Sequence, residues 1–377
     1  MSNNIARREW LKQSTLAALG IGFSLRSLGG EDYLPRELGS ETGLINLGSN
    51  ENPYGLSPAA KKAINELVGS AHRYQYNIPA LQTFRKELAD YYGVSVEHIL
   101  VTPGSGEALN LMARAYGSGN LVTATPTFGI LPNTAKKIGI TVKEIPLDSS
   151  MMHDLGALQQ AIDASTSQVY ICNPANPTGT IVKPAALKAF CEEASRRTMV
   201  TIDEAYIDFL DAPDNESMVS LVKSGNKNMV IIRTFSKIHA MAGMRVGFVM
   251  AHPDTIKTLA ANYFGNSNFC MSALSMAAAM ASLKDVSHSE GSKQKNAAAR
   301  DYTAKALGEM GYHCIPSYTN FQFFHLKNYP GDFAKDMLAK NVLLRSHELP
   351  DGKYCRVSIG TLAEMKKFIE IMKTVPR

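Results

Sequence analysis

The chain has 377 residues, of which 45% are hydrophobic and 19% are charged. This composition provides a sizeable core and excludes a disordered chain, and the length predicts two domains, or one large domain with an appendage. The formal net charge is +5, and residues 1–30, with four basic residues and one acid, contribute +3 of it. The remaining +2 does not indicate the basic surface of a nucleic-acid-binding protein.

The cysteines and histidines show no pattern of a metal site or of a disulfide framework. Five cysteines are scattered along the chain without a CxxC pair, and the nine histidines have no HxxxH spacing. An odd, widely spaced set of cysteines is typical of ordinary, mostly buried thiols. We therefore expect no bound metal.

The N-terminal residues 1–30 resemble an export signal. Arg7 and Arg8 precede an apolar run over 16–25, which is shorter than the roughly 20 residues that span a bilayer. The segment resembles the twin-arginine motif, with Ala6 and Trp10 as departures from its usual form. The alternative is an amphipathic helix that packs on the body or on a partner subunit. We favour export to the periplasm over a cytoplasmic location and expect no stable membrane insertion.

From residue 45 onward, apolar runs rich in β-branched residues alternate with helical patterns. This alternation predicts a mostly parallel sheet with helices on both faces. The predicted strands are 99–101, 121–124, 140–145, 168–172, 199–202, 229–233 and 246–250. The predicted helices between them are 78–92, 107–116, 128–138, 155–164 and 184–197.

The pattern changes near residues 262–268 and predicts a second, smaller domain. A buried helix is expected at 271–283 because this run is rich in Ala and Met. Short strands at 314–316, 321–326 and 354–359 and helices at 332–340 and 361–373 follow. The predicted organisation is a signal or helix at 1–30, an N-terminal arm and large domain at 31–265, and a small α+β domain at 266–377.

Several motifs follow the predicted strands directly. Residues 102–107 form a Gly-rich turn that opens a helix, and such a turn offers backbone N–H groups to an anion. It matches neither GxGxxG nor the P-loop pattern. Asp203 ends a strand, where an acid faces the ligand crevice of an open α/β sheet. Glu204 and Asp208 have an alternative reading as solvated acids at a helix start.

Lys237 also follows a strand, and its neighbours suggest a reactive amine. Thr234, Ser236 and Arg245 are residue types that bind phosphate. A lysine that is partly desolvated and close to cationic groups has a lowered pKa. Its neutral amine can then attack a carbonyl carbon and form a Schiff base.

Taken in order, these motifs resemble the class I/II, fold-type-I pyridoxal-phosphate aminotransferases, and most closely their histidinol-phosphate branch. The resemblance covers about 45–373 and rests on NENP, GSGE, NPxNPTG, DEAY, TxSK with an arginine eight residues later, and RVSIGT. It implies an α/β fold with a mostly parallel sheet between helices and a smaller α+β C-terminal domain. It also implies a homodimer that moves an amino group from L-histidinol phosphate to 2-oxoglutarate.

The resemblance assigns a role to each cofactor-binding residue of this chain. Lys237 becomes the Schiff-base lysine and proton shuttle, and Asp203 the partner of the pyridinium nitrogen. Asn176 and Tyr206 hold the 3-oxygen of pyridoxal 5′-phosphate. The phosphate is bound by the backbone N–H groups of Ser105 and Gly106 and by the side chains of Thr234, Ser236 and Arg245. Phe128 stacks on the cofactor ring.

Four further residues are assigned to the substrate or to the neighbouring subunit. Arg356 matches the arginine that clamps the substrate carboxylate. Arg345 matches a second substrate-facing arginine, with a surface arginine as the alternative. Tyr54, in the motif that also contains Glu51, is placed near the substrate side chain. Tyr76 reaches the cofactor of the other subunit, and Arg-Tyr pairing makes Tyr74 the alternative.

Other functions remain open at this point. They are an aromatic or broad-specificity aminotransferase, a fold-type-I lyase or decarboxylase, and a binding protein that keeps the fold without turnover. An exported protein would favour one of these, because histidine biosynthesis is cytoplasmic. A nicotinamide-dependent oxidoreductase is disfavoured, since its phosphate-loop fingerprint is absent from the sequence.

Overall fold

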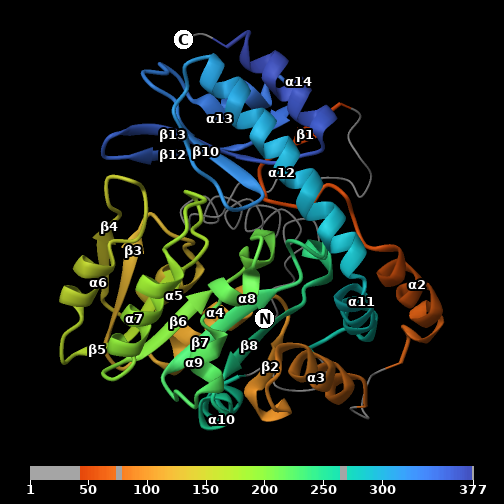
Figure 1. Cartoon of the computed structure of the whole chain (residues 1–377), viewed down its shortest axis with the longest axis vertical. Helices are drawn as coiled ribbons and strands as arrows, with labels where there is room; N and C mark the ends of the chain where they lie inside the picture. The colour runs from red at the N-terminus through yellow and green to blue at the C-terminus, as the bar shows by residue number, and fades with distance from the viewer. Residues whose placement is uncertain (1–42, 74–78, 264–269, 376–377) are drawn as a thin grey trace, which may run out of the picture. The chain divides into compact units, whose positions relative to one another are not determined.

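The strands predicted between residues 99 and 250 form one seven-stranded sheet in the computed structural model, which describes residues 43–73, 79–263 and 270–375 (Figure 1). The strand order is β2-β8-β7-β6-β5-β3-β4, and β8 runs opposite to the other six strands of this sheet. The prediction of a mostly parallel sheet is therefore confirmed. The strands are β2 (Ile99–Thr102), β3 (Asn120–Thr125), β4 (Val142–Pro146), β5 (Thr166–Cys172), β6 (Met199–Asp203), β7 (Met229–Thr234) and β8 (Gly247–Ala251).

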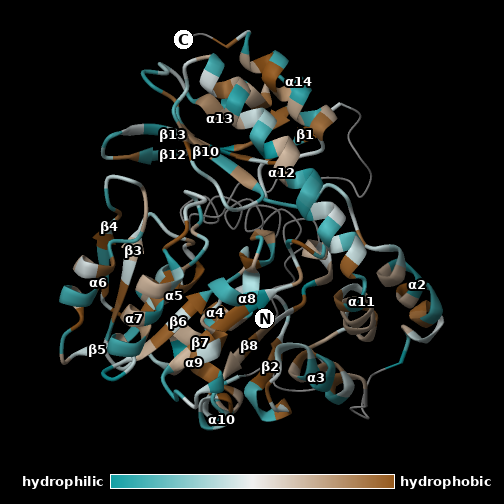
Figure 2. Cartoon of the chain, viewed as in Figure 1, coloured by the Kyte–Doolittle hydropathy of each residue, from teal (hydrophilic) through white to brown (hydrophobic). Residues whose placement is uncertain are grey.

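Helices cover both faces of this sheet. Along β5, Val169 and Ile171 belong to one apolar cluster and Tyr170 and Cys172 to the other. Because both faces are covered, the central strands β6, β7 and β8 are buried throughout and largely apolar, and brown predominates there in Figure 2. The edge strand β4 (VKEIP) is partly exposed. The helices on one face are α4 (Ser105–Ala115), α5 (Ile130–Lys137) and α10 (Pro253–Ala261), and those on the other are α3 (Pro79–Tyr92), α6 (Leu155–Ala161), α7 (Pro184–Ala194) and α9 (Val219–Lys223).

Two more helices extend the core on the α3 side. The helix α11 (Ala273–Lys284) packs against α2 (Pro58–Leu67) and α3, and Met276 and Leu283 join the core cluster there. The buried helix predicted from the Ala/Met-rich run is thus confirmed. The helix α2 was not predicted, although Ser57 caps its first turn by accepting a hydrogen bond from the Ala60 N–H at 3.1 Å.

A four-stranded antiparallel sheet follows in the C-terminal part of the chain. Its order is β12-β13-β10-β9, and its helices form a separate core with it. Its elements are α12 (Val286–Glu309), β9 (Cys314–Ile315), β10 (Phe321–His325), α13 (Phe333–Leu338), β12 (Arg345–Leu349), β13 (Gly352–Ser358) and α14 (Leu362–Met372). The strand β12 was not predicted. The domain boundary at 265/266 stays a prediction.

Short elements complete the described chain. The strands β1 (Ile45–Asn46) and β11 (Val342–Leu343) pair in parallel. The short helices are η1 (Val68–Ser70), η2 (Val96–His98), η3 (Ile207–Phe209), α8 (Pro213–Glu216) and η4 (Ala242–Met244). None of the described helices has the length and apolar character needed to cross a bilayer. The predicted export segment at 1–30 lies outside the described residues, as do Tyr74 and Tyr76.

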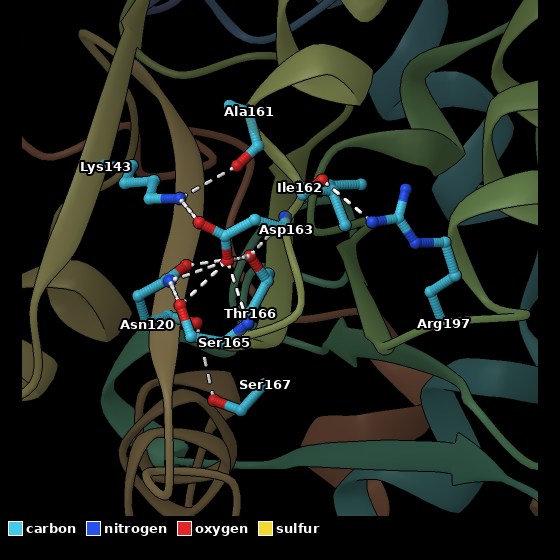
Figure 3. Close-up of polar contacts among 9 residues, drawn as sticks. All are labelled: Asn120, Lys143, Ala161, Ile162, Asp163, Ser165, Thr166, Ser167 and Arg197. Atoms are coloured by element: carbon cyan, nitrogen blue, oxygen red, sulfur yellow. Dashed lines mark hydrogen bonds and ion pairs between the residues drawn. The ribbon is translucent and has the colours of Figure 1, made fainter.

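A polar cluster ties the amino ends of three strands together (Figure 3). The Asp163 carboxylate, between α6 and β5, accepts hydrogen bonds from Lys143 Nζ at 2.5 Å, Asn120 Nδ2 at 3.2 Å and Ser165 Oγ at 2.8 Å. These donors hold the pKa of Asp163 well below its usual range. The cluster fixes β3, β4 and β5 at the edge opposite their carboxyl ends, so it is structural and lies apart from the predicted site.

Candidate active site

The described residues predicted to hold the cofactor lie at or near the carboxyl edge of the seven-stranded sheet. Parallel strands bring their carboxyl ends to one edge, where ligands bind in open α/β sheets. The antiparallel β8 starts at that edge, so Arg245, two residues before Gly247, joins the same region. The strands β2, β3, β5, β6 and β7 end at or shortly before Gly104, Phe128, Asn176, Asp203 and Lys237.

The start of α4 forms a cradle for an anion. Gly104 precedes the helix with φ of 82°, and no side chain caps the first turn, so the N–H groups of Ser105 and Gly106 stay available. A Cβ at Gly104 would collide with the Arg245 guanidinium, and a Cβ at Gly247 would collide with the Ser105 nitrogen. Glycine at both positions therefore allows the helix terminus and the arginine to approach.

Two hydroxyl groups complete the cradle. Thr234 Oγ1 donates a hydrogen bond to Ser236 Oγ at 2.9 Å, and Arg245 Nη1 lies 3.5 Å from the same Ser236 oxygen. Backbone N–H groups, hydroxyls and a guanidinium are together the donor set that holds a phosphate monoester. The residues present therefore fit the phosphate of pyridoxal phosphate.

Lys237 extends its amine toward the N-terminal segment. Its Nζ donates to the carbonyl oxygens of Ser49 at 3.3 Å and Asn50 at 3.1 Å, and it lies 5.6 Å from the Tyr206 ring centroid. Burial, and next the positive charge of Arg356, lower the pKa of Lys237 to about 8. Near neutral pH an appreciable fraction of the amine is thus uncharged and nucleophilic. The lowered pKa is the shift that the sequence predicts for Lys237.

Asp203 lies fully buried at the end of β6. Its Oδ1 accepts a hydrogen bond from the Ala205 N–H at 3.1 Å, and its Oδ2 accepts one from the Tyr170 hydroxyl at 3.3 Å. Burial raises the pKa of Asp203 to about 6. A buried carboxylate with so few donors favours a cationic partner such as a pyridinium N–H.

Asp203→Asn is expected to stabilise the cofactor-free protein at pH 8 by about 3 kcal/mol and to weaken cofactor binding. Folding raises the pKa of this carboxyl from 3.8 to about 6. The folded state then binds more protons than the unfolded state between these values, so ionisation of Asp203 costs stability as the pH rises through this window. Thermal unfolding at pH 5 and pH 8 measures the effect. A gain that does not grow between the two pH values would contradict this assignment.

Tyr206, Asn176 and Arg356 form a connected network. Asn176 Nδ2 donates to the Tyr206 hydroxyl oxygen at 3.3 Å, and Arg356 Nη1 donates to Asn176 Oδ1 at 2.8 Å. Burial raises the pKa of Tyr206 above its ordinary value, so it stays a phenol. The structure therefore joins the residues predicted for the 3-oxygen to the arginine predicted for the substrate.

Two arginines face each other across neighbouring strands. Arg345 on β12 is the direct register partner of Arg356 on β13, and like charges placed directly opposite in a sheet repel. Both donate to the Gly48 carbonyl oxygen, Arg345 Nε at 3.3 Å and Arg356 Nη2 at 2.8 Å. Burial, and next these two cations, lower the pKa of the adjacent His347 to about 4. Such a cationic pair suits an anionic ligand.

Two predicted site residues, Tyr54 and Phe128, have their described contacts away from Lys237 and Asp203. The Tyr54 ring centroid lies 5.2 Å from Lys295 Nζ, and the Tyr54 N–H donates to Asn52 Oδ1 at 3.1 Å. Phe128 is half-buried between β3 and α5 and packs on the core cluster of α4 and α5. No contact described for either side chain reaches Lys237 or Asp203. Their roles at the substrate and at the cofactor ring stay predictions.

The alternative reading of Glu204 as a solvated acid is wrong. Its side chain is 1% exposed and accepts hydrogen bonds from Arg233 Nε at 3.0 Å and Ser217 Oγ at 2.8 Å. Asp208 keeps more exposure, with an oxygen 3.7 Å from Arg233 Nη1. Glu204 is buried because β6 ends at Asp203 and the next side chain lies on the opposite face of the sheet, which α9 covers.

Glu204→Ala is expected to destabilise the fold by about 3 kcal/mol, because it leaves the Arg233 guanidinium buried without its carboxylate. Glu193→Ala provides a matched control, since Glu193 pairs with Arg196 on the surface at 2.7 Å and such pairs contribute less than about 1 kcal/mol. Urea unfolding of the two variants measures both effects. Equal losses of unfolding free energy in the two variants would contradict a larger contribution from the buried pair.

Three residues in the site had no role assigned from the sequence: Asn50, Ser358 and Tyr170, although Asn50 and Ser358 stand in the NENP and RVSIGT motifs. Asn50 has a φ of 52° and is buried, and asparagine is among the few residues that adopt this conformation readily. That preference was a usable signal. Tyr170 lies within an apolar strand, and nothing in its local pattern marks its contact with Asp203. Among the described residues, no group of His, Cys, Asp and Glu side chains could hold a metal.

The chain is similar to known proteins over most of its length. A family model described as aminotransferase class I and II matches residues 42–372. The chain is 33% identical over 347 residues to the histidinol-phosphate aminotransferase of Moorella thermoacetica, covering 91% of this chain and 88% of that protein. It is 34% identical over 342 residues to the histidinol-phosphate aminotransferase of Bacillus subtilis strain 168, covering 89% and 93%.

A solved structure shows the same fold. Histidinol-phosphate aminotransferase from Sinorhizobium meliloti, in complex with pyridoxal-5′-phosphate, matches with a TM-score of 0.80 at 24% identity, covering 86% of this chain and 89% of that one. At that identity the likeness concerns the fold alone.

Proposed function

The chain belongs to the class I and II aminotransferases, and from that membership we propose that it transfers the amino group of L-histidinol phosphate to 2-oxoglutarate. It is a pyridoxal-phosphate-dependent enzyme. The relatives at 33–34% identity that carry the histidinol-phosphate name support the choice of amino donor. The choice of acceptor follows from the resemblance of the motifs.

The observation that carries the proposal is the opposed pair Arg345 and Arg356. Histidinol phosphate bears a phosphate monoester on the carbon next to its amino-bearing carbon, where an amino acid bears its carboxylate. The same cationic pair then holds a dianion in one half-reaction and the carboxylate of the 2-oxo acid in the other. An aromatic amino acid carries a single α-carboxylate, which needs fewer cationic partners than a phosphate dianion. It therefore explains less well why two guanidinium groups converge on the Gly48 oxygen.

The residues around Lys237 divide the remaining tasks. When bound, pyridoxal phosphate supplies an electrophilic carbonyl carbon and an electron-withdrawing ring. The Asp203 carboxylate holds a proton on the ring nitrogen, and Asn176 and Tyr206 hold the 3-oxygen. The amine of Lys237 takes the proton from the substrate Cα, because its lowered pKa leaves it partly neutral. The arginine pair orients the Cα–H bond toward that amine.

Steady-state kinetics with 2-oxoglutarate as acceptor test the donor. The value of kcat/KM for histidinol phosphate is expected to exceed that for unphosphorylated histidinol by about 100-fold or more, since each charge-assisted hydrogen bond contributes about 1.5–3 kcal/mol. Preference for phenylalanine or tyrosine would instead make the enzyme an aromatic aminotransferase. Release of carbon dioxide from O-phosphothreonine without amino transfer would make it a decarboxylase.

We further propose a homodimer and export through the twin-arginine route. The resemblance supports the dimer, in which Tyr76, or Tyr74, reaches the cofactor of the other subunit. The Arg7-Arg8 pair before a short apolar run supports export. Sizing by light scattering tests the first proposal, and the N-terminal residue of the protein from its host tests the second. A periplasmic protein that begins after residue 30 would disfavour a biosynthetic donor.

A further inference from the structure

The hydroxyl oxygen of Tyr206 accepts two hydrogen bonds from side-chain amides. Asn50 Nδ2 lies 3.0 Å from it and Asn176 Nδ2 lies 3.3 Å from it. A phenol oxygen has two lone pairs for acceptance and one proton to donate. With both lone pairs engaged, the proton is left to point in the one remaining direction.

Neighbouring groups contact both amides, and one of them fixes the orientation of the Asn176 amide. Arg356 can only donate, so the amide atom of Asn176 that it contacts at 2.8 Å is the oxygen. Ser358 Oγ accepts the Asn50 backbone N–H at 2.7 Å, so its own proton is free to go to Asn50 Oδ1 at 3.0 Å. Asn176 therefore presents its NH₂ group to Tyr206, and a flipped Asn176 amide would lose the Arg356 hydrogen bond. In the orientation that the structure shows, Asn50 also presents its NH₂ group to Tyr206.

The backbone of Asn50 is held independently of its side chain. Its carbonyl oxygen accepts hydrogen bonds from Lys237 Nζ at 3.1 Å and from Asn320 Nδ2 at 2.9 Å. Its left-handed φ of 52° is also accessible to glycine without strain. The amide group can thus be removed while the main chain keeps its place beside Lys237.

From this geometry we propose that Asn50 and Ser358 are positioning residues that aim the Tyr206 hydroxyl proton at the 3-oxygen of the bound cofactor. The inference rests on the proposed function. A Tyr206 proton donated to that oxygen stabilises its ionised form, and a tyrosine free to turn would donate to it for less of the time. Asn50 acts through Tyr206, so its effect requires the tyrosine hydroxyl.

Spectroscopic titration of the cofactor-loaded protein tests this proposal with Asn50→Gly and Asn50→Asp. Loss of the Asn50 donor is expected to raise the pH midpoint of the cofactor absorbance change by about 0.5–1 unit, the equivalent of one hydrogen bond. The isosteric aspartate is expected to raise it more than glycine, because an ionised carboxylate accepts the Tyr206 proton and draws it away from the cofactor. A residue that merely fills space would show the opposite order.

A double-mutant cycle and a second site keep the test decisive. In a Tyr206→Phe background, Asn50→Gly is expected to leave the midpoint unchanged. Ser358→Ala is expected to raise the midpoint as Asn50→Gly does, and Ser358→Thr, which keeps the hydroxyl, to restore it. Unchanged midpoints in both single variants, or an equal shift without the tyrosine hydroxyl, would overturn the inference. A wild-type protein that takes up no pyridoxal phosphate would instead overturn the proposed function.

Discussion

Lys237→Ala is expected to reduce transamination by at least about 10⁴-fold, because it removes both the covalent attachment point and the group that moves the proton at Cα. The partly buried amine of Lys237 has a pKa of about 8 and lies among Asp203, Tyr206 and Arg356, whose charges and ring act on it. No other lysine of the described chain has a contact with Tyr206 that could replace it.

The Lys237→Ala protein is also expected to bind pyridoxal phosphate without a covalent bond, since the cradle of Gly104, Ser236 and Arg245 stays intact. Reduction with borohydride followed by mass measurement distinguishes the two proteins: the wild type keeps the cofactor mass and the variant does not. Lys284→Ala, at an exposed lysine paired with Glu87, is the matched control and is expected to keep full activity. Retained turnover in Lys237→Ala would contradict the assignment.

Arg356→Ala is expected to lower kcat/KM for both histidinol phosphate and 2-oxoglutarate by about 10³-fold. Two charge-assisted hydrogen bonds to an anion contribute about 4 kcal/mol, which corresponds to that factor. The dissociation constant of the cofactor is expected to change by less than about tenfold, since the phosphate cradle does not include Arg356. Kinetics of both half-reactions and a cofactor titration measure these effects.

Arg345→Ala is the comparison that separates the two arginines. It is expected to weaken histidinol phosphate more than 2-oxoglutarate, because the second cation matters most for a dianion. Equal loss of substrate and cofactor affinity in Arg356→Ala would show that this arginine supports the pocket and does not clamp the substrate.

The large sheet could be predicted from the sequence because most of its strands are buried on both faces. Residues 169–172 and 229–232 are continuous apolar stretches, and the observed strands β5 and β7 contain them. The strand β12 escaped prediction because Arg345, Ser346 and Glu348 make it polar and only its pairing with β13 gives it structure. The local sequence pattern does not predict a strand that forms only because it pairs with another strand.

The same division holds for the site. Lys237, Asp203 and Arg245 stand next to strand ends, so order along the chain was sufficient to place them. The contact between Asn50 and Ser358 joins residues 308 positions apart, and the Tyr170 contact with Asp203 crosses two neighbouring strands. Neither has a local signature. Burial of Glu204 against Arg233 likewise depends on how β6 and β7 pair.

The absorption spectrum of the cofactor-loaded protein, recorded as a single amino donor is added without any acceptor, tests the central claim most directly. The account predicts a yellow protein that loses its colour on addition of histidinol phosphate and recovers it on addition of 2-oxoglutarate. A protein that stays colourless when given pyridoxal phosphate, or a yellow protein that histidinol phosphate leaves unchanged, would contradict it.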